Sequence, residues 1–436
     1  MTATPPTFVV CVSRVLGLWL WPANRASVLW KDIRPGQRNR PVEGIDRVKQ
    51  VYGYNLTDVK LHNRFLVYNT IRLHGPIRRA SVARKTRLTR ATITNIINEF
   101  IEEGLVTSSQ QGDSSHGYLQ INPHAFKICA VHLQGAIAKV AVLTPDMEFW
   151  ENDTVPLDGS PEEALARVAA AVNSFKEKYD LKVMGVAVSG VVDAGRAFIK
   201  HSVTLGWEDV CLVEHLQRLV GIPMVVERNA NAPLLAEVWQ GSAVGKSNVV
   251  YVNYGSGIGC GIMMNGELVA RDGLVTGELG HITVDPSGPF CHCGNQGCLE
   301  ALVSVPALVR QCKAISQRFE HIDDGDVESL FAALYAQIEQ GDELALNLLK
   351  RTAEYVGLAL ANMITLFGPE VVVLGNGFVK AGEKFCQMIE RAVERRVLKS
   401  SLGSFQIVPT AIKSDAILVG ISSLAIRHLF NGSTVN

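Results

Sequence analysis

The regular alternation of short apolar runs with amphipathic stretches, which begins at Lys127, constrains the fold of this chain more than any other feature. The strand-like runs are ICAVHL (128–133), KVAVLT (139–144), MGVAVSG (184–190), MVVERN (224–229), NVVYVNYG (248–255), GIMMNG (261–266) and VVVLGNG (371–377). Stretches with helical periodicity separate several of them, at 161–178, 233–239, 305–319, 327–339, 343–367 and 381–396. Strands that alternate with helices are typical of α/β proteins, so residues 123–436 are predicted to form a large α/β domain.

Composition excludes several classes of protein. Hydrophobic residues make up 47% of the 436 residues and charged residues 19%, so the chain can bury large cores and is not disordered throughout. No apolar run reaches the roughly 18 residues that a membrane-spanning helix needs, so no membrane partner is expected. The nine cysteines are an odd number in a long chain, which favours a reducing compartment, and we expect a cytoplasmic protein. Residues 1–54 are expected to form a poorly ordered extension.

A block of positive charge lies upstream of the α/β domain. Between Lys60 and Asn98 there are nine basic residues and no acidic residue, whereas the whole chain has a formal net charge of zero. Such a local excess is typical of a surface that binds nucleic acid. The alternative is a helical oligomerisation module, but such a module does not need this unbalanced positive charge.

The apolar residues around this block repeat with helical spacing. One stripe consists of Leu61, Phe65, Tyr68 and Ile71, and a second consists of Ile93, Ile96, Ile97, Phe100 and Ile101. A short helix is predicted at 79–86, and Thr89 is placed to cap the last helix. Two extended runs, 105–108 and 118–121, flank the turn-rich loop QQGDSSHG. Three helices and a hairpin predict a winged helix-turn-helix domain at 55–122, with double-stranded DNA as its partner.

The third predicted helix carries short polar side chains opposite its apolar stripe, as a recognition helix would. The residues expected at base edges are Arg90, Thr92 and Asn95. Those expected at phosphates, where they anchor the domain without reading sequence, are Arg78, Arg79, Arg84 and Lys85. The loop between the two extended runs carries Asp113 and no arginine at its tip, so it is not expected to read the minor groove.

A glycine-rich segment follows one of the predicted strands directly. It runs Tyr254-Gly-Ser-Gly-Ile-Gly-Cys-Gly261. Glycine allows the backbone to approach a phosphate or a sugar closely. Because a second strand follows rather than a helix, the segment is not a dinucleotide-binding fingerprint, and a tight hairpin explains it equally well.

The strongest local signal is a cluster of cysteine and histidine residues. The run Gly277-Glu-Leu-Gly-His281 is followed by Cys291-His-Cys293-Gly-Asn-Gln-Gly-Cys298-Leu-Glu300. One imidazole and three thiolates can complete a tetrahedral zinc site without leaving a position for a catalytic water, so a structural zinc is expected. The predicted ligands are His281, Cys291, Cys293 and Cys298. On spacing alone His292 could replace His281, and the other alternative is a group of buried free cysteines.

Taken together, these segments resemble the ROK family, which comprises sugar-responsive repressors and sugar kinases. The resemblance extends from about residue 55 to the C-terminus, and its most specific part is GELGH…CHCGNQGCLE, with ligand spacings of ten, two and five residues. It implies a two-lobed actin-like ATPase fold behind the winged helix-turn-helix domain, with zinc at the four ligands named above. It also implies sugar contacts from Glu278, His281 and Glu300, so that His281 serves both sites.

The resemblance also bears on catalysis. The family's kinases use an Asp base within Glu-Asn-Asp-x-Asn, and the matching segment here is Glu227-Arg228-Asn229-Ala230-Asn231. Asn229 occupies the base position, and an amide cannot take up a proton at physiological pH. The family's first phosphate loop, Asp-x-Gly-Gly-Thr, reads His132-Leu-Gln-Gly-Ala136 here and lacks the Asp that helps to hold magnesium. A protein without kinase activity is expected, and the alternative is an ATP-dependent sugar kinase that retains a DNA-binding domain.

The predicted function is therefore that of a sugar-responsive transcriptional regulator. We expect a repressor whose binding to its operator changes when a sugar or sugar phosphate occupies the cleft between the lobes. Arg228 and Asn229 are expected at that ligand, and Arg228 would favour an anionic one unless its side chain turns away to the surface. A homodimer or homotetramer is expected, because paired half-sites require paired readers. A sugar-transport protein is a further candidate partner.

Overall fold

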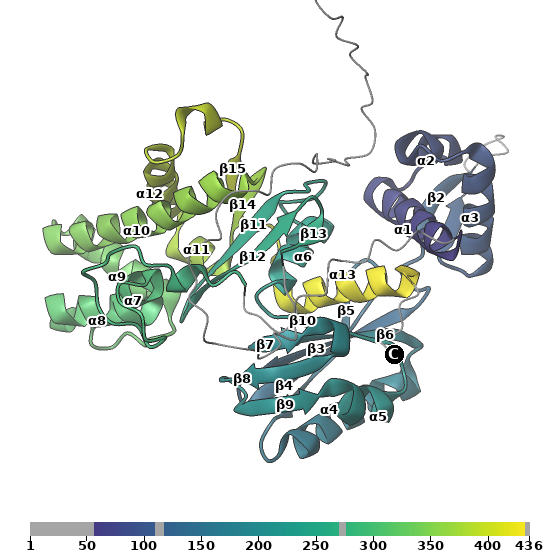
Figure 1. Cartoon of the computed structure of the whole chain (residues 1–436), viewed down its shortest axis with the longest axis horizontal. Helices are drawn as coiled ribbons and strands as arrows, with labels where there is room; N and C mark the ends of the chain where they lie inside the picture. Colours follow the sequence, from purple (N-terminus) through teal and green to yellow (C-terminus); the bar gives the residue numbers. More distant parts are fainter. Residues whose placement is uncertain (1–55, 110–116, 270–275, 432–436) are drawn as a thin grey trace, which may run out of the picture. The chain divides into compact units, whose positions relative to one another are not determined.

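The computed structural model describes residues 56–109, 117–269 and 276–431 (Figure 1). The predicted extension at 1–54 and the loop residue Asp113 lie outside these ranges. The N-terminal elements are α1 (Leu56–His74), α2 (Arg79–Thr86), α3 (Arg90–Glu102), β1 (Val106–Ser109) and β2 (Tyr118–Ile121). β1 and β2 pair antiparallel, and an isolated bridge joins Ile77 to Leu119. This is the predicted order of a winged helix-turn-helix.

The two apolar stripes form the core of this N-terminal module. Ile71 of α1 and Ile97 and Phe100 of α3 have no exposed surface. Burial of each such side chain stabilises a fold by about 1.5–3 kcal/mol, so the stripes hold α3 against α1. The Thr89 hydroxyl accepts a hydrogen bond from the amide of Thr92 at 3.2 Å, which confirms the predicted cap. Ile101 was expected in the second stripe but is 38% exposed, because the last turn of α3 extends beyond the core.

A five-stranded sheet begins the α/β part of the chain. In spatial order its strands are β10 (Met224–Arg228), β6 (Leu181–Val188), β3 (Lys127–Gln134), β4 (Ile137–Leu143) and β5 (Phe149–Pro156). β10, β6 and β3 run parallel, whereas β3, β4 and β5 form an antiparallel meander. Helix α4 (Pro161–Lys178) packs on β4 and β5, and it begins at a capping box made by Ser160 and Glu163.

A smaller antiparallel sheet was not indicated by the sequence pattern. It consists of β7 (Val191–Asp193), β8 (Phe198–Ser202) and β9 (Trp207–Cys211). Strands of three to five residues with polar residues in succession give little periodic signal. A π-helical turn (Val213–Gln217) and α5 (Arg218–Val220) lead from this sheet towards β10.

A second five-stranded sheet forms the other half of the α/β part. Its strands in spatial order are β13 (Glu267–Leu268), β12 (Ile258–Met264), β11 (Val249–Tyr254), β14 (Val371–Leu374) and β15 (Gln406–Pro409). The helices of this half are α6 (Ala232–Gln240), α7 (Leu299–Val303), α8 (Val305–Ile315), α9 (Val327–Glu339), α10 (Glu343–Phe367), α11 (Asn376–Ala381) and α12 (Glu383–Glu394). α9 and α10 have the predicted bounds. The helix expected at 381–396 is α12 alone, because Gly382 interrupts the chain with a φ of 92°.

The C-terminal helix α13 (Ala416–Asn431) was not predicted, and it connects the parts of the fold (Figure 1). It packs on β6 and β3 of the first sheet, on α6 and on α1 of the N-terminal module. The approach is close: a Cβ on Gly185 of β6 would lie 2.7 Å from the carbonyl oxygen of Ile421. Among the described helices, none is both long and apolar enough to cross a membrane.

Candidate functional sites

The first candidate site is the exposed face of α2 and α3. Arg84 and Lys85 at the end of α2, and Arg90 and Asn95 on α3, all expose their side chains. They carry no carboxylate partner among the described residues. These four residues are therefore free to contact a polyanion.

Three other residues that were expected at DNA have contacts within the protein. The Arg78 guanidinium lies 5.0 Å from the centre of the Tyr118 ring, at the root of the hairpin. Arg79 Nη1 donates to the Asn98 amide oxygen at 2.9 Å. Thr92 is half-buried, and its hydroxyl lies 2.9 Å from that of the cap residue Thr89, so it supports the start of α3.

The acidic residues that follow the basic block face α1. Glu99 forms ion pairs with Lys60, at 3.1 Å, and with Arg64, and Glu103 pairs with Arg64 at 2.6 Å. The negative charges of these two carboxylates, which would repel a polyanion, are thus neutralised by ion pairs within the module. The pairs also cross-link α1 to α3, and although exposed ion pairs are worth little singly, Arg64 is only 14% exposed and is shared by both acids.

The second candidate site is the cysteine and histidine cluster. The ligand atoms of His281, Cys291, Cys293 and Cys298 all lie within 4.8 Å of one another. Cys291 Sγ is 3.6 Å from His281 Nδ1, and Cys293 Sγ is 3.6 Å from Cys298 Sγ. His292 is not one of these four, but its exposed ring is close by, with Nδ1 3.8 Å from Cys291 Sγ and 3.6 Å from Glu300. The structure thus brings together the four residues predicted from spacing.

The donor set and its spacing fit a tetrahedral metal ion. Zinc bonds of about 2.3 Å to sulfur and 2.0 Å to nitrogen separate two sulfurs by roughly 3.8 Å and a sulfur from a nitrogen by roughly 3.5 Å. The loop can wrap this closely because Gly294 and Gly297 have φ angles of 93° and 73°. A Cβ on Gly297 would lie 1.6 Å from the carbonyl oxygen of Asp285, so no other residue fits there.

The predicted sugar contacts are adjacent to this cluster. His281 presents Nδ1 to the thiols, while its Nε2 lies 3.9 Å from Glu278. Glu278 also accepts a hydrogen bond from Arg228 Nη2 at 3.3 Å. Arg228 is 6% exposed, and its guanidinium donates to the carbonyl oxygen of Thr276 at 2.8 Å. Arg228 is therefore neither a surface residue nor a cation without a carboxylate partner.

Glu300 supports the glycine-rich turn. Its Oε2 accepts a hydrogen bond from the amide of Ile258 at 2.8 Å. A Cβ on Gly257 would lie 2.7 Å from the same oxygen, so a larger residue there would require the Glu300 side chain to move. The turn joins β11 to β12 as an antiparallel hairpin, the simpler of the two sequence interpretations.

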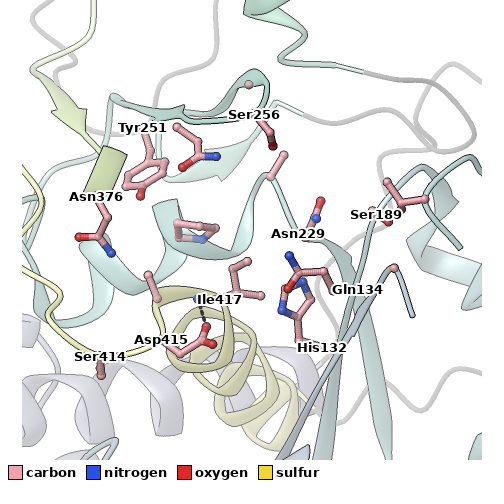
Figure 2. Close-up of a pocket in the computed structure, with 17 residues that line it drawn as sticks. His132, Gln134, Ser189, Asn229, Tyr251, Ser256, Asn376, Ser414, Asp415 and Ile417 are labelled. Atoms are coloured by element: carbon pink, nitrogen blue, oxygen red, sulfur yellow. Dashed lines mark hydrogen bonds between the residues drawn. The ribbon is translucent and has the colours of Figure 1, made fainter. Parts of the chain in front are cut away.

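A cavity of about 680 Å³ separates the two five-stranded sheets, within the range of small-molecule sites. Its polar lining residues are His132, Gln134, Ser189, Thr204, Asn229, Asn253, Ser256, Asn376, Ser414 and Asp415. Figure 2 shows His132 and Asn229 on one side and Tyr251 and Asn376 on another. Among the described residues that line this cavity there is no lysine or arginine. Of the predicted sugar contacts only Asn229 lines it; Arg228, Glu278, His281 and Glu300 do not.

His132 is a cavity residue whose side chain sequence reasoning treated only as a missing Asp. It is 2% exposed, and neither ring nitrogen has a hydrogen-bond partner among the described residues. Burial lowers the pKa of His132 to about 4, so the ring is neutral at physiological pH. Asp415, on the same cavity, accepts a hydrogen bond from Lys139 at 2.9 Å; burial alone would raise its pKa, but Lys139 and the amide of Leu418 hold it below the usual range.

The free energy of unfolding, measured as a function of pH, should show the contribution of the buried His132 ring. Its pKa is lower in the folded chain than in the unfolded one, about 4 against 6.5, so its contribution is complete above pH 6.5 and is lost as the pH falls towards 4. Between pH 7 and pH 5 we expect a loss of about 2 kcal/mol in the free energy of unfolding. His132→Gln should flatten this slope in denaturant melts, whereas His321→Gln, at an exposed position, should keep it. Parallel slopes in all three proteins would contradict the assignment.

Helix α13 connects the cavity with the N-terminal module. Asp415 caps its first turn by accepting a hydrogen bond from the amide of Ile417 at 3.1 Å (Figure 2). It also accepts one from the amide of Leu418 at 3.2 Å. At the other end, the Phe430 ring lies 4.6 Å from the ring of Tyr68 and 5.9 Å from that of Phe100. One helix therefore begins at the wall of the cavity and ends in the core that holds α3. The Ser-Asp pair before an apolar run is the sequence signal that would have located its start.

Comparison with known proteins agrees with this architecture. A xylose repressor from Bacillus spizizenii is 27% identical over 391 residues, which cover 86% of this chain and 97% of the repressor. A glucokinase from Thermotoga maritima is 29% identical over 312 residues, which cover 68% of this chain and 96% of the kinase. The crystal structure of a ROK family transcriptional regulator, a homologue of the E. coli MLC protein, covers 86% of this chain with a TM-score of 0.75 at 24% identity, a likeness in fold.

The predicted fold class, a winged helix-turn-helix followed by a two-lobed α/β body, is confirmed. Residues 128–428 match the ROK family, a span that includes both five-stranded sheets and most of α13. This chain belongs to the ROK family.

Proposed function

We propose that this protein is a sugar-responsive transcriptional regulator, a repressor that binds an operator through α2 and α3 and senses a sugar in the α/β body. One observation carries the proposal. The similarity to the Bacillus xylose repressor covers 86% of the chain, whereas the similarity to the Thermotoga glucokinase covers only 68%. Almost the whole length of each relative is aligned, so the kinase is too short to include a counterpart of the N-terminal module, whereas the repressor is long enough.

The residues in the cavity favour sensing over phosphate transfer. Asn229 lines the cavity where the family's kinases place a carboxylate base, and an amide cannot accept the proton of a sugar hydroxyl. His132 replaces the Asp of the first phosphate loop, and a buried neutral imidazole is a poor partner for magnesium, which prefers oxygen ligands.

The second candidate function is a sugar kinase that retains a DNA-binding module. The observation in its favour is the intact glycine-rich hairpin, which places Ser256 and Gly259 in the cavity. A coupled assay for ADP release against a panel of hexoses separates the two. The regulator predicts no release above that of a protein-free blank. Turnover that disappears on changing Asn229 to Ala would establish the kinase.

The ligand that the site favours is an uncharged sugar. Glu278, His281 and Glu300 are the contacts that the family resemblance implies, and Asn229 adds an amide at the edge of the cavity. The pairing of Arg228 with Glu278 removes the cation that would have favoured a sugar phosphate. In calorimetric competition we expect hexose phosphates to displace a bound neutral hexose poorly; displacement at equal concentrations would contradict this preference.

We further propose that the four-ligand cluster holds zinc. The ion would be held by His281, Cys291, Cys293 and Cys298 and would fix the loop 281–298 and, through the His281 ring, the orientation of Glu278. Its part is structural, because all four positions around it are taken by the protein.

Helix α13 is the proposed route from the sugar to the operator. Lobe movement that displaces Asp415 would move the whole helix, and Phe430 would transmit the shift to Tyr68 and Phe100. Two copies in a homodimer or homotetramer would thereby change the spacing of their recognition helices. A sugar-transport protein remains a candidate partner, and pull-down with the full chain would test it.

Changing Phe430 to Ala should uncouple DNA binding from the sugar. We expect a destabilisation of about 3–5 kcal/mol, because the ring is 4% exposed and fills a gap between three aromatic side chains. Operator affinity at saturating sugar should then equal the affinity without sugar, measured by fluorescence anisotropy. Phe430→Leu, which keeps most of the volume, should retain part of the response. A full response in the Ala variant would exclude this route.

A further inference from the structure

A second cavity, of about 280 Å³, lies where the N-terminal module contacts the α/β body. Its walls come from α1, α6, α13 and the turn that joins β12 to β13. We call it the joint cavity, and the residues that matter for its chemistry are Arg72, Trp239, Lys246 and Arg427. No motif in the sequence pointed to it, because these residues are far apart along the chain.

The joint cavity is positively charged. Arg72, Lys246 and Arg427 line it, and among its described lining residues there is no aspartate or glutamate. The nearest carboxylates are weak partners: Glu370 lies 3.9 Å from Lys246 and already accepts two backbone amides, and Glu267 is 79% exposed at 3.6 Å from Arg427. Because exposed ion pairs of this kind contribute little free energy, Lys246 and Arg427 can leave these carboxylates and bind another anion.

Arg72 is the cation for which a counter-ion would matter most. Its guanidinium stacks 3.7 Å above the Trp239 ring and donates to the carbonyl oxygen of Trp239 at 2.8 Å and to Asn69 Oδ1. Within the described part of the chain no carboxylate lies within ion-pair distance of it. Burial lowers the pKa of Arg72 to about 10, the signature of a cation that has been desolvated without gaining an anion.

The remaining lining suits an organic anion rather than a bare ion. Leu235, Val238, Met263 and Leu424 provide an apolar wall, and Ser247 adds a hydroxyl. We propose that the joint cavity binds a small phosphate- or carboxylate-bearing metabolite, held by Arg72, Lys246 and Arg427. The larger cavity between the sheets has no cation in its described lining, so the two cavities differ in the charge that they favour.

Occupation of the joint cavity would act on the N-terminal module directly. Arg72 belongs to α1, Arg427 to α13, and Lys246 to the connection between α6 and β11, so one anion would bridge three elements. The bridge would fix α1 against the body and would thereby resist the displacement that the sugar produces. This second input does not depend on whether the cavity between the sheets binds a sugar.

Calorimetry on the full-length protein at constant ionic strength tests the proposal, with inorganic phosphate and glucose 6-phosphate as probes and glucose as the uncharged reference. We expect glucose 6-phosphate to bind wild type, and the double variant Lys246→Gln, Arg427→Gln to bind it at least tenfold more weakly. Both side chains are partly exposed, so folding should be retained, and the charge reversal Lys246→Glu alone should also weaken binding of glucose 6-phosphate.

The DNA-binding face is the other cationic surface that could attract phosphate, and a matched variant separates the two sources. Arg84→Gln with Lys85→Gln should leave glucose 6-phosphate binding unchanged while DNA binding falls. Three results would overturn the proposal: absence of binding of both probes to wild type, equal affinity in wild type and the joint-cavity variant, or loss of binding in the Arg84, Lys85 variant. None of them depends on a response to sugar, so failure here and failure of the proposed function are distinguishable.

Discussion

Replacing Cys291 with Ser is expected to lower the melting temperature of the α/β body by about 6–12 °C. Structural zinc contributes folding free energy directly, about 10–16 kcal/mol in small zinc-dependent peptides, and a large lobe that keeps its own core should lose a fraction of that. With a loss of about 3 kcal/mol and a shift of roughly 2–4 °C per kcal/mol for domains of this size, the expected change is readily measured by calorimetry. Treatment with a strong chelator should have the same effect on wild type and none on the variant.

Cys211→Ser is the matched control. Cys211 is a half-buried free cysteine on β9 that lies outside the four-ligand cluster. Its replacement makes the same change of sulfur to oxygen outside the cluster, so it should move the melting temperature by only about one or two degrees. Sugar affinity should also fall in the Cys291 variant, because the loop that carries His281 and Glu278 loosens. A chelator-insensitive melting temperature in wild type would show that the cluster holds no structural metal.

Two pairs of substitutions on the N-terminal module should separate anchoring of DNA from reading of its sequence. Arg84→Gln with Lys85→Gln should weaken binding to every duplex alike and reduce the slope of log affinity against log salt by about 2, one for each phosphate that the variant no longer neutralises. Arg90→Ala with Asn95→Ala should weaken binding to the operator by about 2–6 kcal/mol, at least thirtyfold, while binding to random DNA falls much less. Anisotropy titrations at several salt concentrations give both quantities.

The body of the protein supplies a matched control for the charge change. Lys350 and Arg351 are adjacent, exposed cations on α10, as Arg84 and Lys85 are on α2. Lys350→Gln with Arg351→Gln removes the same net charge and should leave both the affinity and the salt slope unchanged. If both double variants weaken binding equally, net charge rather than the α2 and α3 face explains DNA binding.

The N-terminal module could be predicted almost completely from sequence, because the interactions that define its elements join residues close together in the chain. The stripes, the Thr89 cap and the short α2 all follow from helical periodicity and side-chain hydrogen bonding within a few residues. Ile101 was the exception, because it was expected in the apolar stripe but is 38% exposed. Thr92 stays a predicted base contact, and its hydroxyl also lies 2.9 Å from that of the cap residue Thr89, a proximity that a helical wheel does not represent.

The residues of the ligand cluster were predicted, whereas most residues that line the cavity between the sheets were not, for a related reason. Cysteine and histidine spacing within eighteen residues restricts the geometry so strongly that four ligands can be named in advance. The pairing of Arg228 with Glu278, in contrast, joins residues that are fifty positions apart, and a contact at that separation follows only from the fold. His132 and Asp415 meet at one cavity for the same reason, and the position of α13 decides it.

The most direct test of the account measures operator affinity with and without sugar. Full-length protein is first used to select genomic DNA fragments, and the recovered duplex is then titrated by anisotropy at physiological salt in the presence of neutral hexoses and pentoses. The account predicts enrichment of discrete sites and at least a tenfold change in affinity with one uncharged sugar, without release of ADP when ATP is present. Failure to enrich any site, or an affinity that no sugar alters, would contradict it.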